Sequence, residues 1–69
     1  MNEVLHKLIA ALPAKLRDPL TLSTLDEMST ADIAEVLGVR QSAVRSRIFR
    51  ARQILREKLD ARLEGKPGA

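Results

Sequence analysis

Arginine is the residue type that could do the most chemistry in this chain of 69 residues, and it is concentrated in one segment. Residues 40–62 carry eight basic and two acidic side chains, a local charge of +6, whereas the remaining residues sum to −3. Guanidinium groups bind phosphate and the edge of guanine through paired hydrogen bonds. A basic segment joined to a mildly acidic body therefore indicates a polyanionic partner.

Catalytic and metal chemistry have no comparable support. Cysteine is absent and His6 is the one histidine, which excludes disulfides, thiolate-bound zinc and a multi-histidine metal site. Asp32 is placed to cap a helix, Glu35 is placed as a surface residue, and the serines lack a nucleophile-elbow context. We therefore expect no enzyme, no metal and no cofactor.

The composition favours a small helical domain. Leucine and alanine dominate the apolar residues, while tyrosine and tryptophan are absent. The longest apolar run, residues 8–12, is far shorter than the roughly 20 residues of a membrane helix. We expect an all-α, soluble, cytoplasmic protein with no membrane partner. Residues 1–64 are expected to form one domain, and residues 65–69 a flexible tail.

Hydrophobic periodicity predicts four helices. The first spans about residues 2–12 and ends before Pro13. The second starts near Ala14, with its regular part expected from Pro19 to about Glu27. Its predicted core residues are Leu16, Leu20 and Leu25.

The third helix has the clearest boundaries. Ser29 and Asp32 resemble a capping box, and Gly38 offers the left-handed conformation that ends a helix about eight residues long. The fourth helix is predicted from Arg40 or Gln41 to about Leu63. Its apolar stripe is formed by Val44, Ile48, Ala51, Leu55 and Leu59. Two helices joined by a glycine turn, the second long and basic, describe a helix-turn-helix.

A helical wheel of about 100° per residue separates this apolar stripe from a polar and basic face. Phe49, the single aromatic residue, falls in the middle of the basic face. It either contacts DNA sugar or a thymine methyl group, or packs against the first helix. The arginines are likewise either DNA ligands or a solvated face. The residues predicted to bind DNA are Arg40, Gln41, Ser42, Arg45, Ser46, Phe49, Arg50, Arg52 and Gln53.

Residues 12–17, 25–39 and 43–52 resemble region 4 of bacterial sigma factors, above all the extracytoplasmic-function group. The most specific string is VRSRIFRAR, residues 44–52. The resemblance implies that the fourth helix reads the −35 promoter element through positions 45, 46, 49 and 50. It also implies partners: double-stranded promoter DNA, the flap of the RNA polymerase β subunit, and an anti-sigma factor. The apolar cleft for the protein partners would lie on the first two helices.

The sequence departs from this family at several positions. Arg40 stands where proline is frequent, Thr30 where tyrosine is frequent, and Glu27 where glycine is frequent. No segment resembles region 2, so we expect an excised domain or a stand-alone regulator. Two alternatives to promoter recognition stay open: a module that mainly binds the flap or an anti-sigma factor, and the DNA-binding domain of a response regulator.

Overall fold

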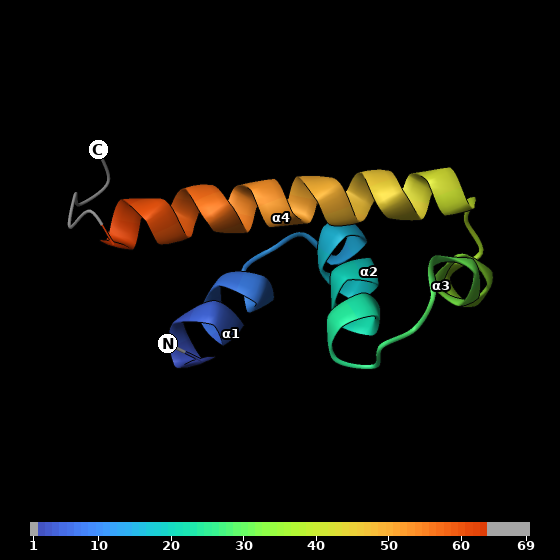
Figure 1. The fold of residues 1–69 in the computed structure, drawn as a ribbon, viewed down its shortest axis with the longest axis horizontal. Coiled ribbons are helices and arrows are strands. Elements are labelled where there is room, and N and C mark those ends of the chain that lie inside the picture. The colour runs from blue at the N-terminus through green and yellow to red at the C-terminus, as the bar shows by residue number, and fades with distance from the viewer. Residues whose placement is uncertain (1, 64–69) are drawn as a thin grey trace.

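The computed structural model describes residues 2–63, so the predicted tail at residues 65–69 lies outside the described residues. Within them the chain forms helices Asn2–Ala10 (α1), Ala14–Thr24 (α2), Thr30–Leu37 (α3) and Gln41–Leu63 (α4), with no strand. The all-α prediction is confirmed. The long α4 runs along one side of the molecule, and the three shorter helices all lie on the same side of α4 (Figure 1). In this described part, no helix is long and apolar enough to cross a membrane.

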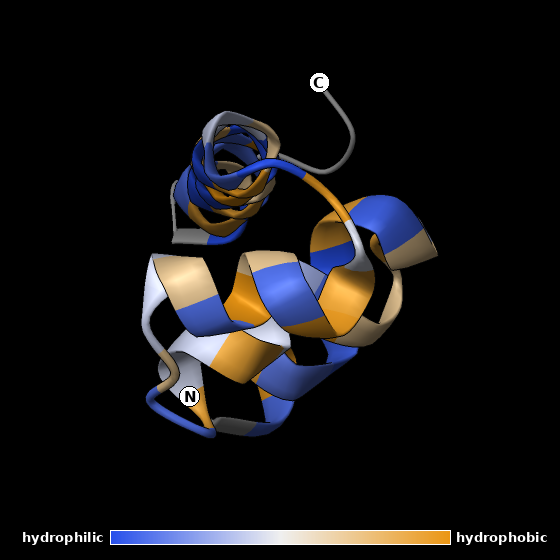
Figure 2. Cartoon of the chain, turned by 90° about the vertical axis from the view of Figure 1, so that its right-hand side faces the viewer, coloured by the Kyte–Doolittle hydropathy of each residue, from blue (hydrophilic) through white to orange (hydrophobic). Residues whose placement is uncertain are grey.

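The core lies between α4 and the other helices, and it has two parts. The larger part contains Leu8, Leu12, Leu20, Ala51 and Leu55. The smaller part contains Ile33, Ala34 and Val44. Seen along α4, hydrophobic residues face the other helices and hydrophilic ones face outward (Figure 2). The predicted apolar stripe of α4 is therefore confirmed, and burial of this stripe fixes which face of α4 reaches solvent.

α1 ends earlier than predicted, at Ala10 rather than Leu12. Leu12 is still buried, in the turn that follows. Its amide donates to the Ile9 carbonyl at 3.0 Å, which is a tightened last turn three residues long. Pro13 explains the difference, because a residue that precedes proline avoids the helical region.

α2 starts at Ala14, as predicted, but its regular part differs from the prediction at both ends. It is regular from Ala14, because the Pro13 carbonyl accepts hydrogen bonds from the amides of Leu16 and Arg17 at 2.9 and 2.8 Å. Pro19 therefore lies inside the helix, where its ring is fully buried in the core. The helix ends at Thr24 rather than Glu27. The expectation that Pro19 begins the regular part was wrong, because the helix already starts at Ala14, and burial of the proline ring offsets the hydrogen bond that its missing amide cannot donate.

Leu25 was also wrongly predicted as a core residue. It is the C-cap of α2 and 65% of its surface is exposed, whereas Leu20 of the same helix is buried. α1 and α2 both pack mainly against α4, so they diverge beyond it and leave the end of α2 uncovered (Figure 1). Leucine content alone does not reveal this divergence.

The helix-turn-helix has the predicted local structure. The Ser29 hydroxyl accepts a hydrogen bond from the Asp32 amide at 3.1 Å, which caps α3. The reciprocal bond from the Asp32 carboxylate is not found among residues 2–63, so this is a simple cap. Gly38 ends α3 in the left-handed conformation, with φ 69° and ψ 35°. Val39 follows it and is half-buried against the smaller core cluster.

Glu27 adopts the same left-handed region, with φ 52°, in the connection between α2 and α3. The family resemblance noted from the sequence implies that glycine is frequent at this position. The connection therefore keeps a glycine-like backbone although the residue is glutamate, at a cost of about 1 kcal/mol in strain.

Candidate nucleic-acid interface

The structure places every residue of the predicted DNA-binding set at the surface. Arg40 lies in the turn before α4, its carbonyl accepting the first helical hydrogen bond from the Val44 amide at 3.1 Å. The other predicted residues lie within residues 41–53 of α4. The exposed residues are Arg40, Gln41, Ser42, Arg45, Ser46, Phe49, Arg50, Arg52 and Gln53.

The exposure of Phe49 excludes one of the two interpretations of its ring, namely packing against the first helix. Its side chain is 66% exposed, so it does not pack against α1 in the core. Its chain neighbour Ile48 packs against both core clusters instead. An exposed aromatic ring leaves a large apolar surface in water. The ring is therefore available for an apolar contact with a ligand.

Phe49 borders a hollow of about 300 Å³, which we call the arginine hollow. Three helices contribute to it. It is lined by Ser23, Thr30, Arg45, Ile48, Phe49 and Arg52. The structure thus brings Arg45, Phe49 and Arg52 together, while the other predicted residues lie outside the hollow.

Sequence reasoning missed Ser23 and Thr30 in this hollow. Ser23 lies in the last turn of α2 and Thr30 is the first residue of α3. Both offer hydroxyl groups beside the arginines. The predicted helix-turn-helix could have pointed to Thr30. In this motif the helix before the recognition helix crosses the DNA backbone, so residues at its start lie close to phosphates.

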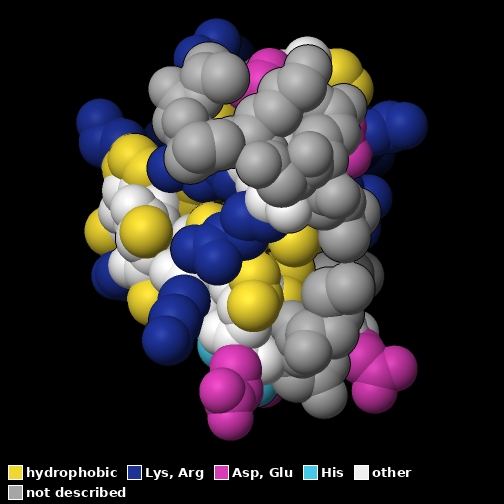
Figure 3. Space-filling view, turned by 90° about the vertical axis from the view of Figure 1, so that its left-hand side faces the viewer, with side chains coloured by type: hydrophobic (Ala, Val, Ile, Leu, Met, Phe, Trp, Pro, Cys, Tyr) yellow, Lys and Arg dark blue, Asp and Glu magenta, His cyan; other side chains and the backbone are white. Residues whose placement is uncertain are grey.

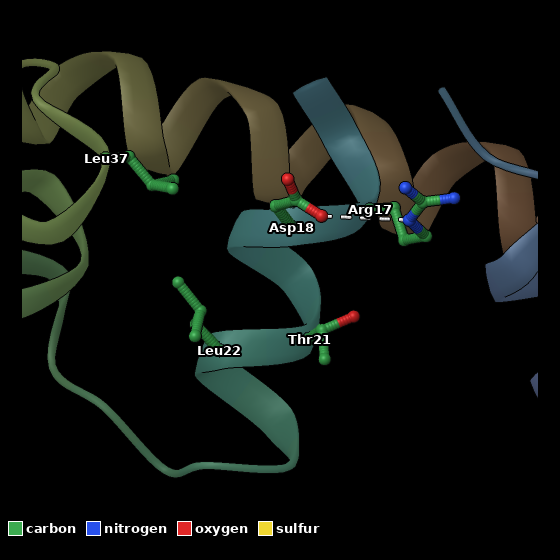
Figure 4. Close-up of a pocket in the computed structure, with 5 residues that line it drawn as sticks. All are labelled: Arg17, Asp18, Thr21, Leu22 and Leu37. Atoms are coloured by element: carbon green, nitrogen blue, oxygen red, sulfur yellow. Dashed lines mark ion pairs between the residues drawn. The ribbon is translucent and has the colours of Figure 1, made fainter. Parts of the chain in front are cut away.

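The arginines on this face keep their charge uncompensated within the protein. Across residues 2–63 the one ion pair joins Arg17 and Asp18, at 3.7 Å between Nε and Oδ1 (Figure 4). That pair borders another hollow, lined by α2 residues and Leu37 of α3, with no residue from α4. The positive charge of α4 is therefore free to attract a polyanion.

The carboxylates and the histidine of the described residues do not gather into a metal-holding cluster. No group of three or more histidine, aspartate and glutamate side chains within residues 2–63 lies close enough to hold a metal ion. His6 is exposed on α1. Guanidinium and hydroxyl groups such as those of the arginine hollow are suited to phosphate and base edges.

A second surface feature, which we call the apolar groove, has a volume of about 260 Å³ and runs between α1, α2 and α4. Its lining is almost entirely apolar. The lining residues are Leu5, His6, Ile9, Leu20, Thr24, Leu25, Arg52 and Leu55. At the end of the molecule where α1 begins, hydrophobic side chains lie at the surface directly beside basic ones (Figure 3).

Comparison with known proteins agrees with this geometry. The sequence matches the family model described as "Sigma-70, region 4" over residues 2–55, which includes every predicted DNA-binding residue. The chain belongs to the sigma-70 region 4 family. The match favours this family over the response regulators that we considered from the sequence.

Curated relatives of this region 4 domain are sigma factors. The chain is 37% identical over 59 residues to proteins named "ECF RNA polymerase sigma-E factor" from Haemophilus influenzae and from Escherichia coli K12. The protein of the same name from Salmonella typhi is equally similar. Each alignment covers 86% of this chain and 31% of the relative. The chain therefore spans about a third of the length of these relatives.

Proposed function

We propose that this domain recognises the −35 element of bacterial promoters by placing the first half of α4 in the major groove. The observation that carries the proposal is the exposed Phe49, held between Arg45 and Arg52 over the arginine hollow. Arg45 and Arg50 would read guanine, Ser46 would adapt to either base type, and Phe49 would contact a thymine methyl group. Arg40, Gln41, Ser42, Arg52 and Gln53 would hold the DNA backbone.

The direct test is binding to duplex DNA by fluorescence anisotropy. A duplex with a −35-like element is compared with a scrambled duplex of the same composition, at several salt concentrations. We expect tighter binding to the −35-like duplex and a loss of affinity as salt rises, because phosphate contacts release counterions. Equal affinity for both duplexes would contradict promoter recognition.

We further propose that the apolar groove docks a helix of RNA polymerase, namely the flap of the β subunit, and that an anti-sigma factor would compete for it. Support comes from Leu25, which is 65% exposed and lines the groove together with Leu5, Ile9 and Leu55. Apolar grooves of this kind accept the apolar face of an amphipathic helix. A pull-down with the isolated flap segment tests this role, and a flap that is not retained would contradict it.

This function is regulatory rather than enzymatic, and a bacterial cytoplasm is where promoter DNA and polymerase are found together. We also infer that residues 1–64 act as one folding unit. Support for the unit comes from α4, whose apolar stripe holds parts of both core clusters.

A further inference from the structure

Arg52 is the one side chain that lines both surface features described above. It borders the arginine hollow together with Arg45 and Phe49. It also borders the apolar groove, between Leu55 on its own helix and Leu25 at the end of α2. The proposed DNA site and the proposed protein site therefore meet at one exposed arginine.

The two ends of this side chain face different surroundings. The lining of the apolar groove is almost entirely apolar, so Arg52 contributes chiefly its methylene stem there. The arginine hollow has a larger polar share, and Ser23 and Thr30 are among the residues that line it. An arginine commonly buries its stem on apolar surface while its guanidinium stays with polar neighbours. We therefore place the guanidinium on the side of the arginine hollow.

The chemistry of the groove defines its occupant. A helix that presents an uncharged apolar edge matches a lining whose one fixed charge is at Arg52. A second copy of this chain is disfavoured, because each copy carries a net charge of +3 and its own Arg52 would approach the other. The occupant is thus a partner protein's apolar helix.

We propose that such a helix, when bound in the apolar groove, strengthens DNA binding through Arg52. A helix packed against the methylene stem of Arg52 restricts this side chain to few rotamers. The conformational entropy that Arg52 would otherwise lose on binding phosphate is then already lost. The guanidinium is then already directed to the DNA. By linkage, DNA must strengthen binding of the helix by the same factor. This inference rests on the proposed DNA-binding function.

The test uses the full chain and a synthetic stapled peptide as the probe. The peptide is an amphipathic helix of about 15 residues with leucines at i, i+3, i+4 and i+7 and no acidic residue. Affinity for the −35-like duplex is measured by anisotropy with and without saturating peptide. We expect the peptide to raise DNA affinity by roughly fivefold, at the low end of known couplings. We expect DNA to raise peptide affinity equally.

Two matched variants test whether Arg52 carries the effect of the peptide on DNA affinity. Arg52→Met keeps an unbranched apolar stem but lacks the guanidinium, so we expect it to retain peptide binding and lose the gain in DNA affinity. Arg56→Met removes an arginine one turn further along α4 that lines neither feature, so the gain should persist. Circular dichroism verifies that both variants are folded.

The outcomes separate the two proposals. A chain that binds no duplex either with or without peptide contradicts promoter recognition itself. A chain that binds the duplex equally well with and without peptide, or a peptide that does not bind, overturns the coupling alone. A gain that survives in Arg52→Met also overturns it, because Arg52 would then not carry the effect.

Discussion

Ile48 and Phe49 are adjacent on α4, yet they occupy opposite environments. Ile48 packs against both core clusters, whereas Phe49 is 66% exposed over the arginine hollow. Successive residues of a helix point about 100° apart. The packing of Ile48, with the fully buried Val44 and Ala51, therefore sets the rotation of α4 about its axis, and that rotation leaves Phe49 exposed.

Replacing Phe49 by alanine should separate stability from binding. Because the side chain is exposed, we expect Phe49→Ala to change the free energy of unfolding by less than about 0.5 kcal/mol. Its loss of apolar contact should weaken binding to the −35-like duplex by about tenfold. Thermal denaturation and anisotropy measure the two effects. Val36→Ala is the control, since Val36 is 63% exposed on α3 and should leave DNA affinity unchanged.

A strongly destabilised Phe49→Ala variant would contradict the exposed position of this ring. A stable variant with wild-type DNA affinity would instead show that Phe49 does not contact DNA. Only the combination of normal stability and weak binding supports the proposed interface.

Arg45→Ala should reduce the preference for one base sequence over another. A bidentate pair between arginine and guanine contributes about 1–3 kcal/mol to discrimination. We expect the difference in binding free energy between the −35-like and scrambled duplexes to fall by that amount. Competition at a fixed salt concentration measures this difference. Arg62→Ala serves as the comparison, because Arg62 lies in the last turn of α4 and should leave the difference unchanged. If both variants kept the difference, Arg45 would not read a base.

The sequence predicts α3 and α4 well because their signals are local. Ser29 caps within three residues and Gly38 ends α3 through its own backbone conformation. Leu25 and Pro19 were misjudged because their environments depend on how α1 and α2 pack against α4. Ser23 and Thr30 were missed for the same reason. They come from two helices that approach α4 only in the folded chain, so no spacing rule links them to Arg45.

Removing the cap of α3 should lower stability measurably. The Ser29 hydroxyl is the acceptor for the Asp32 amide, and alanine would leave that amide to water. We expect Ser29→Ala to cost about 1 kcal/mol, which corresponds to a fall in Tm of about 4–8 °C for a domain of this size. Ser29→Asp should restore most of the loss, because aspartate is an equally good cap. An alanine variant with unchanged Tm would show that water replaces the cap without cost.

The two left-handed residues should respond to substitution with opposite signs. Glu27 has φ 52°, a conformation that glycine adopts without steric cost, so Glu27→Gly should raise the free energy of unfolding by about 0.5–1 kcal/mol. Gly38 has φ 69°, and a Cβ there would meet no atom within 4 Å. Gly38→Ala should therefore lose about 1 kcal/mol purely through backbone strain. Urea denaturation of both variants gives the two changes. A destabilised Glu27→Gly variant would indicate that the glutamate side chain contributes more than its backbone strain costs.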